Sequence, residues 1–313
     1  MTRTICTLVL ALVVAAANAV AADAAVGAYK GAGCTGRDRV TAFESWLGRP
    51  AEVVLDGAAQ DNWGTMVSST KWSAQCWRNS GKLLVFSLPM LPKDGGRSTL
   101  DAGARGAYND YIRQMAQALV DQGHGNAVVR IGWEFNASWF SWNSLKNPEA
   151  WKAYWRQIVT TMRAVPGAQF QFDWCFIVHS SAPSPEPAYP GDEYVDIIGA
   201  DVYNGNWNPQ LTAEQRWRMV LKGTYGLEWH RKFAAAHGKQ MSYPEWGTGT
   251  RPDGKGGGDD AVFMRNMAQW ISSNPVKYHV YWDYKSPDYD GRLSNGSQPQ
   301  SEAEFLKAFG GRR

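Results

Sequence analysis

The stretches Leu83-Leu84-Val85-Phe86 and Val195-Asp196-Ile197-Ile198 decide the fold class, because both are short and nearly continuous apolar runs. Strands that are buried on both faces have this pattern, as in a parallel sheet covered on either side. Six further strand candidates lie along the chain. We therefore expect eight strands, at residues 26–30, 52–56, 82–88, 127–135, 169–176, 195–203, 239–245 and 278–284.

Helical patterns fill the gaps between these strands. In residues 104–122, for example, apolar side chains recur every three or four positions. Further helices are expected at residues 38–47, 148–165, 215–236 and 260–273. Eight alternations of strand and helix in a chain of this length predict an α/β protein with a single (β/α)₈ TIM barrel.

An open, doubly wound sheet is the alternative fold, and it would need a glycine-rich phosphate turn after the first strand. Residues 31–36 do match G-x-G-x-x-G. The motif alone is weak, however, and the helix that follows does not begin with the expected pattern. The spacing of the later strands also fits eight repeats better than six.

The first residues predict export. Arg3 precedes an apolar stretch at residues 5–17, and Ala17-Asn18-Ala19 is a small-residue cleavage site. This is the pattern of a signal peptide, and the apolar run is too short to span a bilayer comfortably. We expect residues 1–21 to be the signal peptide and residues 22–313 to be the catalytic barrel. The protein would then be secreted or periplasmic, without stable membrane association.

Charge and cysteine usage narrow the possible partners. Lys and Arg number 32 against 29 Asp and Glu, and no basic run with interleaved aromatics occurs, so nucleic acid is not an expected partner. In an oxidising compartment Cys34 and Cys76, both in loop-like sequence, are expected to form a disulfide, and Cys175 to be a buried free thiol. We expect no cofactor, no metal and a monomer.

The carboxyl ends of the expected strands four to eight carry aromatic residues beside carboxylates. The five stretches are Arg130-Ile131-Gly132-Trp133-Glu134-Phe135-Asn136, Asp173-Trp174-Cys175, Asp201-Val202-Tyr203-Asn204, Tyr243-Pro244-Glu245-Trp246-Gly247 and Tyr281-Trp282-Asp283-Tyr284. Active residues of (β/α)₈ barrels lie at this end of the strands. Packing alone would not place charge there so regularly, and the pattern predicts an active site.

Glu134 and Glu245 are the expected catalytic pair. They follow strands four and seven, which lie on opposite sides of the barrel mouth, so their carboxylates can flank a glycosidic bond. One would act as acid and the other as nucleophile, with Tyr203 and Arg130 as candidate donors to the ionised group. The separation of the carboxyl groups decides between retention and inversion, and the sequence leaves it open.

Sixteen Trp residues are far above ordinary usage and favour a cleft that stacks on sugar rings, with about half of them expected in the core. The partner would be a polysaccharide. The predicted substrate-binding residues are Trp133, Asn136, Trp139, Trp142, Trp174, Tyr203, Trp246, Trp282, Asp283 and Arg130. His179, Trp207 and the loop at residues 254–258 are weaker candidates for the cleft. Asp201 and Asp283 could equally form structural ion pairs, and Asp173 could pair with Arg130.

The motifs Arg130-x-x-Trp133-Glu134-x-Asn136 and Pro244-Glu245-Trp246-Gly247 resemble the clan of barrel glycosidases with catalytic Glu after strands four and seven. Within it the chain most resembles glycoside hydrolase family 26, known for mannanases and for relatives that act on other β-linked glycans. The resemblance covers strands four to eight well and the first 120 residues loosely.

This resemblance implies a role for each matched residue. Glu134 would be the acid/base and Glu245 the nucleophile, held by a hydrogen bond from Tyr203, and Trp282 would form the floor of the subsite at the cleavage point. The family usually has His directly before its acid/base, where this chain has Trp133, so mannan need not be the substrate.

The expected function is that of a secreted, retaining, endo-β-mannanase-like glycoside hydrolase. The alternatives are a hydrolase of a bacterial exopolysaccharide or cell-envelope glycan, and a non-catalytic carbohydrate-binding barrel. An esterase is disfavoured because no G-x-S-x-G elbow occurs.

Overall fold

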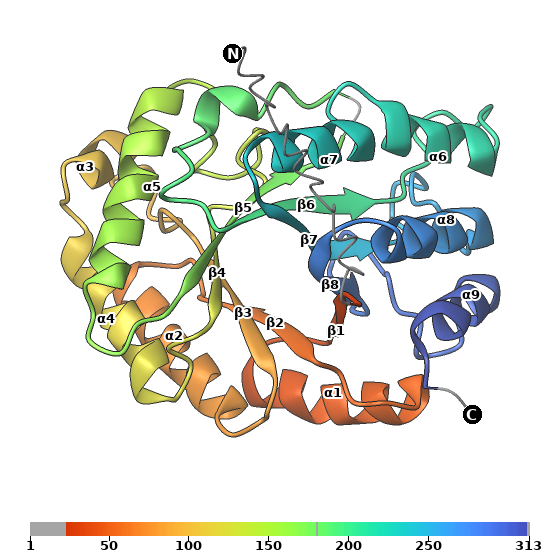
Figure 1. Ribbon diagram of the computed structural model, residues 1–313, viewed down its shortest axis with the longest axis horizontal. Coiled ribbons are helices and arrows are strands. Elements are labelled where there is room, and N and C mark those ends of the chain that lie inside the picture. Colours follow the sequence, from red (N-terminus) through yellow and green to blue (C-terminus); the bar gives the residue numbers. More distant parts are fainter. Residues whose placement is uncertain (1–22, 180, 312–313) are drawn as a thin grey trace, which may run out of the picture.

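The computed structural model describes residues 23–179 and 181–311, and it shows a closed barrel of eight parallel strands in chain order (Figure 1). β8 pairs with β1 and closes the barrel. The single (β/α)₈ barrel is thus confirmed. The strands are β1 (Ala25–Tyr29), β2 (Val53–Gly57), β3 (Leu83–Leu88), β4 (Val128–Ile131), β5 (Gln171–Ile177), β6 (Ile197–Tyr203), β7 (Gln240–Gly247) and β8 (Val276–Trp282). The predicted signal peptide lies outside the described residues and stays a prediction.

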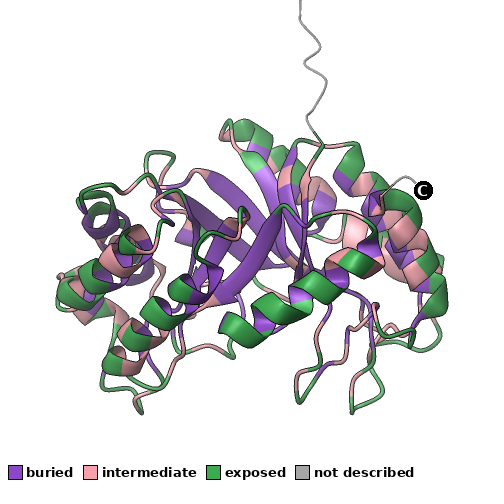
Figure 2. Ribbon diagram, turned by 90° about the horizontal axis from the view of Figure 1, so that it is seen from below, coloured by how far each residue is buried: buried purple, intermediate pink, exposed green. Residues whose placement is uncertain are grey.

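Helices surround the barrel with their exposed faces outward, and the strands form the buried centre (Figure 2). They are α1 (Gly33–Leu47), α2 (Trp63–Trp77), α3 (Leu100–Ala104), α4 (Asn109–Asp121), α5 (Pro148–Arg163), α6 (Ala213–Lys222), α7 (Leu227–Ala236), α8 (Ala261–Ser272) and α9 (Pro299–Phe309), with a short 3₁₀ turn, η1 (Glu186–Ala188). No helix of the described ranges is long and apolar enough to cross a membrane.

Successive side chains along a strand point to opposite faces, so they form two separate layers of the core. On β2, Val53 and Leu55 belong to a small cluster inside the barrel, whereas Val54 belongs to the large cluster between strands and helices. Branched side chains of this kind fill the interior of such barrels, which is therefore a packed core and no pore. Any charged group inside the barrel is consequently shielded from water.

Several predicted boundaries of helices and strands are wrong, because turns interrupt or end these elements. The predicted helices at residues 104–122 and 215–236 are each interrupted, the second between α6 and α7, where Gly223 and Gly226 lie. The predicted fourth strand, residues 127–135, is wrong at its end, because β4 stops at Ile131. Gly132 and Glu134 there have φ of 48° and 53°, in the left-handed region that no strand residue adopts.

The glycine-rich turn at residues 31–36 serves packing and not phosphate binding. A Cβ on Gly36 would lie 1.9 Å from the carbonyl oxygen of Gly31. The buried Asp56 accepts hydrogen bonds from the Gly33 amide and the Trp77 indole, both at 2.7 Å. Asp56 therefore fixes the start of α1.

The predicted disulfide between Cys34 and Cys76 is confirmed, and it joins α1 to α2. The expectation that both lie in loops is wrong, since each belongs to a helix. Cys175 is buried and free, as predicted.

Candidate active site

Glu134 lies in the turn that follows β4, and the backbone of this turn is strained. A non-glycine residue with φ of 53° is uncommon, and such residues cluster at functional sites. The Glu134 amide donates to the carbonyl of Cys175 on β5 at 2.9 Å, which holds the turn against the neighbouring strand. The turn thereby directs the Glu134 carboxyl group toward the barrel axis rather than along the sheet.

Glu245 lies on β7 beside an irregularity in its pairing with β8, between Tyr243 and Trp246. Its Oε1 accepts a hydrogen bond from Arg130 at 2.6 Å, and its Oε2 accepts one from the Tyr203 hydroxyl at 2.8 Å. Both donors were predicted for the ionised group. Each favours the charged form of a carboxylate.

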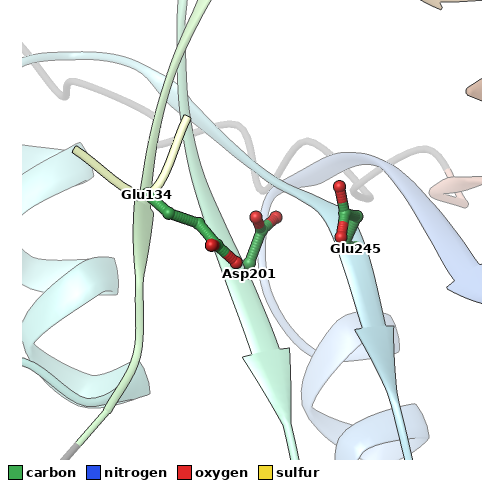
Figure 3. A group of neighbouring side chains, drawn as sticks. All are labelled: Glu134, Asp201 and Glu245. Carbon is green, nitrogen blue, oxygen red and sulfur yellow. The ribbon is translucent and has the colours of Figure 1, made fainter. Parts of the chain in front are cut away.

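Asp201 on β6 lies between the two Glu side chains (Figure 3). One oxygen of each of Glu134, Asp201 and Glu245 lies within 4.8 Å of the others. The fully buried Arg130 makes ion pairs with both Asp201 and Glu245. Three carboxyl groups thus lie together beside one guanidinium, which pairs with two of them, and this arrangement disfavours ionisation of all three at once. Such a trio could ligate a cation, but here a guanidinium already occupies two of its members.

The protonation of Glu134 follows from this arrangement. The pKa of Glu134 is raised to about 7, chiefly by burial and then by the nearby Glu245, while Arg130 opposes both effects. Glu134 is only 8% exposed. A carboxylic acid that keeps its proton near neutral pH beside an ionised carboxylate is the pattern of an acid and nucleophile pair.

Two aromatic side chains frame the pair. The indole of Trp139 is 56% exposed and donates to Glu134 Oε2 at 2.6 Å. Trp282, half-buried at the end of β8, stacks on Tyr29 with ring centres 4.3 Å apart. Its indole nitrogen is buried and has no hydrogen-bond partner among the described residues. Both rings therefore offer a face or a donor to a ligand. Sequence reasoning missed Tyr29, which no motif marks.

The prediction of substrate contact is wrong for Trp142, Trp174 and Trp246, whose side chains are completely buried. Their indoles donate to Trp133, Ala188 and His279, respectively. Trp174 and Trp246 directly follow residues that point into the barrel, and alternation therefore turns them outward against the helices.

Three further predicted substrate contacts are also wrong. Asn136 is buried and bonds to both the amide and the carbonyl of Ile177, so it ties the turn after β4 to β5. Asp283 forms a buried ion pair with Lys30 at 2.8 Å. Arg130 is 0% exposed and cannot reach a sugar.

The remaining predicted contacts keep their place at the site. Trp133 is half-buried, with the Arg130 guanidinium carbon 5.1 Å from its ring centre. Its contact with substrate, like those of Trp139, Tyr203 and Trp282, stays a prediction. The pairing of Asp173 with Arg130 is wrong, because Asp173 accepts from Ser242 and Tyr278 instead.

Comparison with known proteins agrees with this site. Residues 97–226 match the family model of Glycosyl hydrolase family 26. Endoglucanase H of Acetivibrio thermocellus is 26% identical over 292 residues, 87% of this chain and 29% of that protein, so the chain spans less than a third of this curated relative.

Solved structures share the fold. A GH26 beta-mannanase from Bacteroides ovatus has a TM-score of 0.65 at 17% identity, with 91% of this chain and 88% of that one covered. The YdhT protein from Bacillus subtilis has a TM-score of 0.63 at 16% identity, with 93% and 87% covered. Fold, carboxylate pair and family match together resemble those of barrel glycoside hydrolases. Within that class the chain is similar to glycoside hydrolase family 26.

Proposed function

We propose that this chain hydrolyses β-glycosidic bonds of a polysaccharide with retention of configuration, with Glu134 as acid/base and Glu245 as nucleophile. The observation that carries the proposal is the pair's geometry, with one carboxylate oxygen of Glu134 within 4.8 Å of one of Glu245. Retaining glycosidases place the two groups about 5–5.5 Å apart, whereas inverting ones need about 6.5–9.5 Å for an intervening water.

In the first step a Glu245 oxygen bonds to the anomeric carbon while Glu134 gives its proton to the departing glycosidic oxygen. The bond between carbon and leaving oxygen breaks, and the cleaved chain departs as an alcohol. In the second step ionised Glu134 takes a proton from water, whose oxygen attacks the anomeric carbon and releases Glu245 as a carboxylate.

The surrounding residues support each step. Arg130 and Tyr203 hold Glu245 by one oxygen each, which fixes its direction. Asp201 pairs with Arg130, and the effects of burial and of Glu245 on the pKa of Glu134 outweigh the opposing effect of Arg130. Trp139 donates to Glu134 and can stabilise the carboxylate formed after proton transfer.

The proposed setting is outside the cytoplasm, supported by the Cys34–Cys76 disulfide and by the predicted signal peptide. An endo-β-mannanase-like activity is the first candidate. A bacterial exopolysaccharide or cell-envelope glycan is the second, favoured by Trp133 at the position where the family usually has His.

Release of reducing ends from mannan, xylan, β-glucans and bacterial exopolysaccharides tests the proposal. We expect wild type and the surface control Glu149→Gln to cleave one polymer, and Glu245→Gln to lose about 10³-fold or more of that activity. The first-formed product should keep the β configuration in NMR. Inverted product, or Glu245→Gln as active as the control, would contradict the mechanism, and cleavage of no polymer would favour a carbohydrate-binding barrel.

A further inference from the structure

The thiol of Cys175 is a buried group beside the carboxylate pair, and the reaction steps above do not involve it. On β5 the side chains of Asp173 and Cys175 point to the same face, and Cys175 lies nearer the barrel mouth. The Cys175 sulfur is 3.2 Å from Oδ1 of Asp201 and 3.8 Å from the backbone oxygen of Phe176. The thiol therefore donates to the Asp201 carboxyl group, which is the nearer acceptor.

Cys175 stays protonated and can act as a donor at neutral pH. Burial, followed by the charge of Asp201, raises the pKa of the Cys175 thiol well above its ordinary value. The side chain is completely buried, so water does not compete for the acceptor. A thiol is a weak donor, but a hydrogen bond to a charged group in a protein interior is stronger than the same bond in water.

Each carboxyl oxygen of Asp201 thus has a donor from a different strand. Oδ1 accepts from Cys175 on β5, and Oδ2 pairs with the Arg130 guanidinium on β4. The backbone oxygen of Cys175 also accepts from the Glu134 amide at 2.9 Å. Cys175 therefore contacts Asp201 with its side chain and the turn of Glu134 with its backbone.

Asp201 and Glu134 compete for a proton. One carboxyl oxygen of each lies within 4.8 Å of one of the other, and Asp201 lies beside Glu134 in Figure 3. The pKa of Asp201 is raised well above its ordinary range, chiefly by burial, and Glu245 and Glu134 add to the rise, whereas Arg130 and the Cys175 thiol oppose it. Neighbouring carboxyl groups titrate together, so a donor that favours ionised Asp201 leaves the proton on Glu134.

Few of the groups around Asp201 can favour its ionised form. The ionisable groups that face it are, in chain order, Arg130, Glu134, Cys175, Tyr203 and Glu245. Tyr203 donates to Glu245 instead. Within residues 23–179 and 181–311, the side chains that donate to the Asp201 carboxyl group are those of Arg130 and Cys175. Because Arg130 also serves Glu245, the Cys175 thiol is the donor that acts on Asp201 alone.

We propose that Cys175 is a positioning residue for the acid step: its thiol favours the ionised form of Asp201, and the proton consequently stays on Glu134. The inference rests on the proposed function, because it takes Glu134 as the acid. No bond to sulfur forms or breaks. The proton that leaves Glu134 goes to the glycosidic oxygen, and the proton that returns to Glu134 comes from water.

The position of the proton can be measured without a substrate. In protein labelled with ¹³C at the glutamate Cδ, NMR gives the pKa of Glu134, whose resonance is the one that Glu134→Gln removes. Cys175→Ser and Cys175→Ala are matched in size, and of these two side chains only serine has a donor. We expect the pKa of Glu134 to fall by about half a unit in Cys175→Ala and to stay near the wild-type value in Cys175→Ser.

Infrared spectroscopy tests the hydrogen bond itself. The difference between wild type and Cys175→Ser isolates the S–H stretch of Cys175, and this measurement does not require Cys175→Ala to fold. We expect the band at lower wavenumber than that of a thiol without an acceptor. In an Asp201→Asn background the band should move to higher wavenumber, because a neutral acceptor replaces a charged one.

Activity separates this role from the proposed function. On the polymer that wild type cleaves, kcat/KM of Cys175→Ala at pH 8 should be about threefold lower than that of Cys175→Ser, because less Glu134 then carries a proton. Equal pKa values of Glu134 in the two variants, or an S–H band at the position of a free thiol, would overturn the role of Cys175. The expected pKa values in a protein that cleaves no polymer would support the effect of Cys175 on Glu134 and contradict only the proposed function.

Discussion

The interior of the barrel holds buried carboxyl groups at two levels, and the levels differ in their partners. At the lower level Asp173 accepts from the hydroxyls of Ser242 and Tyr278, which are neutral. At the mouth Asp201 and Glu245 share the guanidinium of Arg130. Burial raises the pKa of Asp173 to about 6, and burial together with a second carboxylate raises that of Glu134 to about 7.

This comparison shows that a raised pKa does not by itself identify a catalytic group. Asp173 is 0% exposed and enclosed by hydroxyl donors on β7 and β8, so no substrate reaches it. Glu134 lies at the mouth, next to the exposed Trp139 and opposite Glu245, which accepts hydrogen bonds from Arg130 and Tyr203. Position at the cleft and a second carboxylate nearby distinguish the proposed catalytic Glu134 from the structural Asp173.

Of the changes considered, Arg130→Met should disrupt the carboxyl groups at the barrel mouth most severely. It leaves Asp201 buried without its cation, and removal of one partner from a buried pair costs about 3–5 kcal/mol. We expect the free energy of unfolding, measured in urea, to fall by that amount. The double variant Arg130→Met with Asp201→Asn should recover most of the stability but not the activity. A single variant as stable as wild type would show that the ion pair does not hold this level together.

Tyr203→Phe at the barrel mouth and Tyr278→Phe at the lower level should have different effects, the first on kcat/KM and the second on Tm. Loss of the Tyr203 hydrogen bond to Glu245 removes a charge-assisted interaction of about 1.5–3 kcal/mol, so kcat/KM should fall about 10–100-fold with little change in Tm. Tyr278→Phe, the matched change at Asp173, should lower Tm and leave kcat/KM of the folded protein unchanged. Equal effects of both variants on kcat/KM would remove the distinction between the levels.

Glu134→Gln should change how stability depends on pH. The pKa of Glu134 is about 7 in the folded protein and about 4.5 when unfolded, so the folded state holds more protons between these values. Wild type therefore loses stability relative to the variant as pH rises from about 4.5 to 7. We expect the variant's advantage in Tm to be larger at pH 8 than at pH 4.5, by on the order of 2–4 °C. Glu149→Gln should show no such trend, and a constant Tm difference would argue against the raised pKa.

Trp139→Phe should have the smallest effect on the carboxyl groups at the barrel mouth. It keeps an aromatic face and removes the hydrogen bond to Glu134, which favours the ionised carboxylate. The pKa of Glu134 should rise, and the alkaline limb of the kcat/KM profile should move to higher pH. An alkaline limb that does not move would mean that the indole of Trp139 does not stabilise the ionised form of Glu134 by its hydrogen bond.

The sequence predicted the barrel because apolar strand runs are local, and it predicted that Glu134 and Glu245 meet at the barrel mouth because both lie at strand ends. Alternation could also have shown that Trp174 and Trp246 point outward, since each follows a residue that faces inward. The buried Trp142 and Asn136 depend instead on how the turn after β4 folds back on itself and on β5.

Arg130 and Tyr203 were predicted as donors to Glu245, but other pairings between strands and loops could not be predicted from the sequence. Arg130 stands level with Asp173 in the β4–β5 register, yet its long side chain pairs with Asp201 on β6. Likewise, Lys255 and Arg251 meet Trp207 only because the loops after β6 and β7 pair with each other. Such contacts depend on side-chain reach and loop pairing, which no local pattern encodes.

The pH dependence of kcat/KM on two substrates tests the central assignment most directly. One is the polymer that the protein cleaves, and the other is a dinitrophenyl β-glycoside of the same sugar, whose leaving group needs no protonation. If Glu134 is the acid, kcat/KM on the polymer falls as pH rises through about 7, and the activated glycoside shows no such fall. Glu134→Gln should then lose about 10²–10⁴-fold on the polymer and far less on the glycoside. The same alkaline limb on both substrates, or equal losses in the variant, would contradict the assignment of Glu134 as the protonated partner of Glu245.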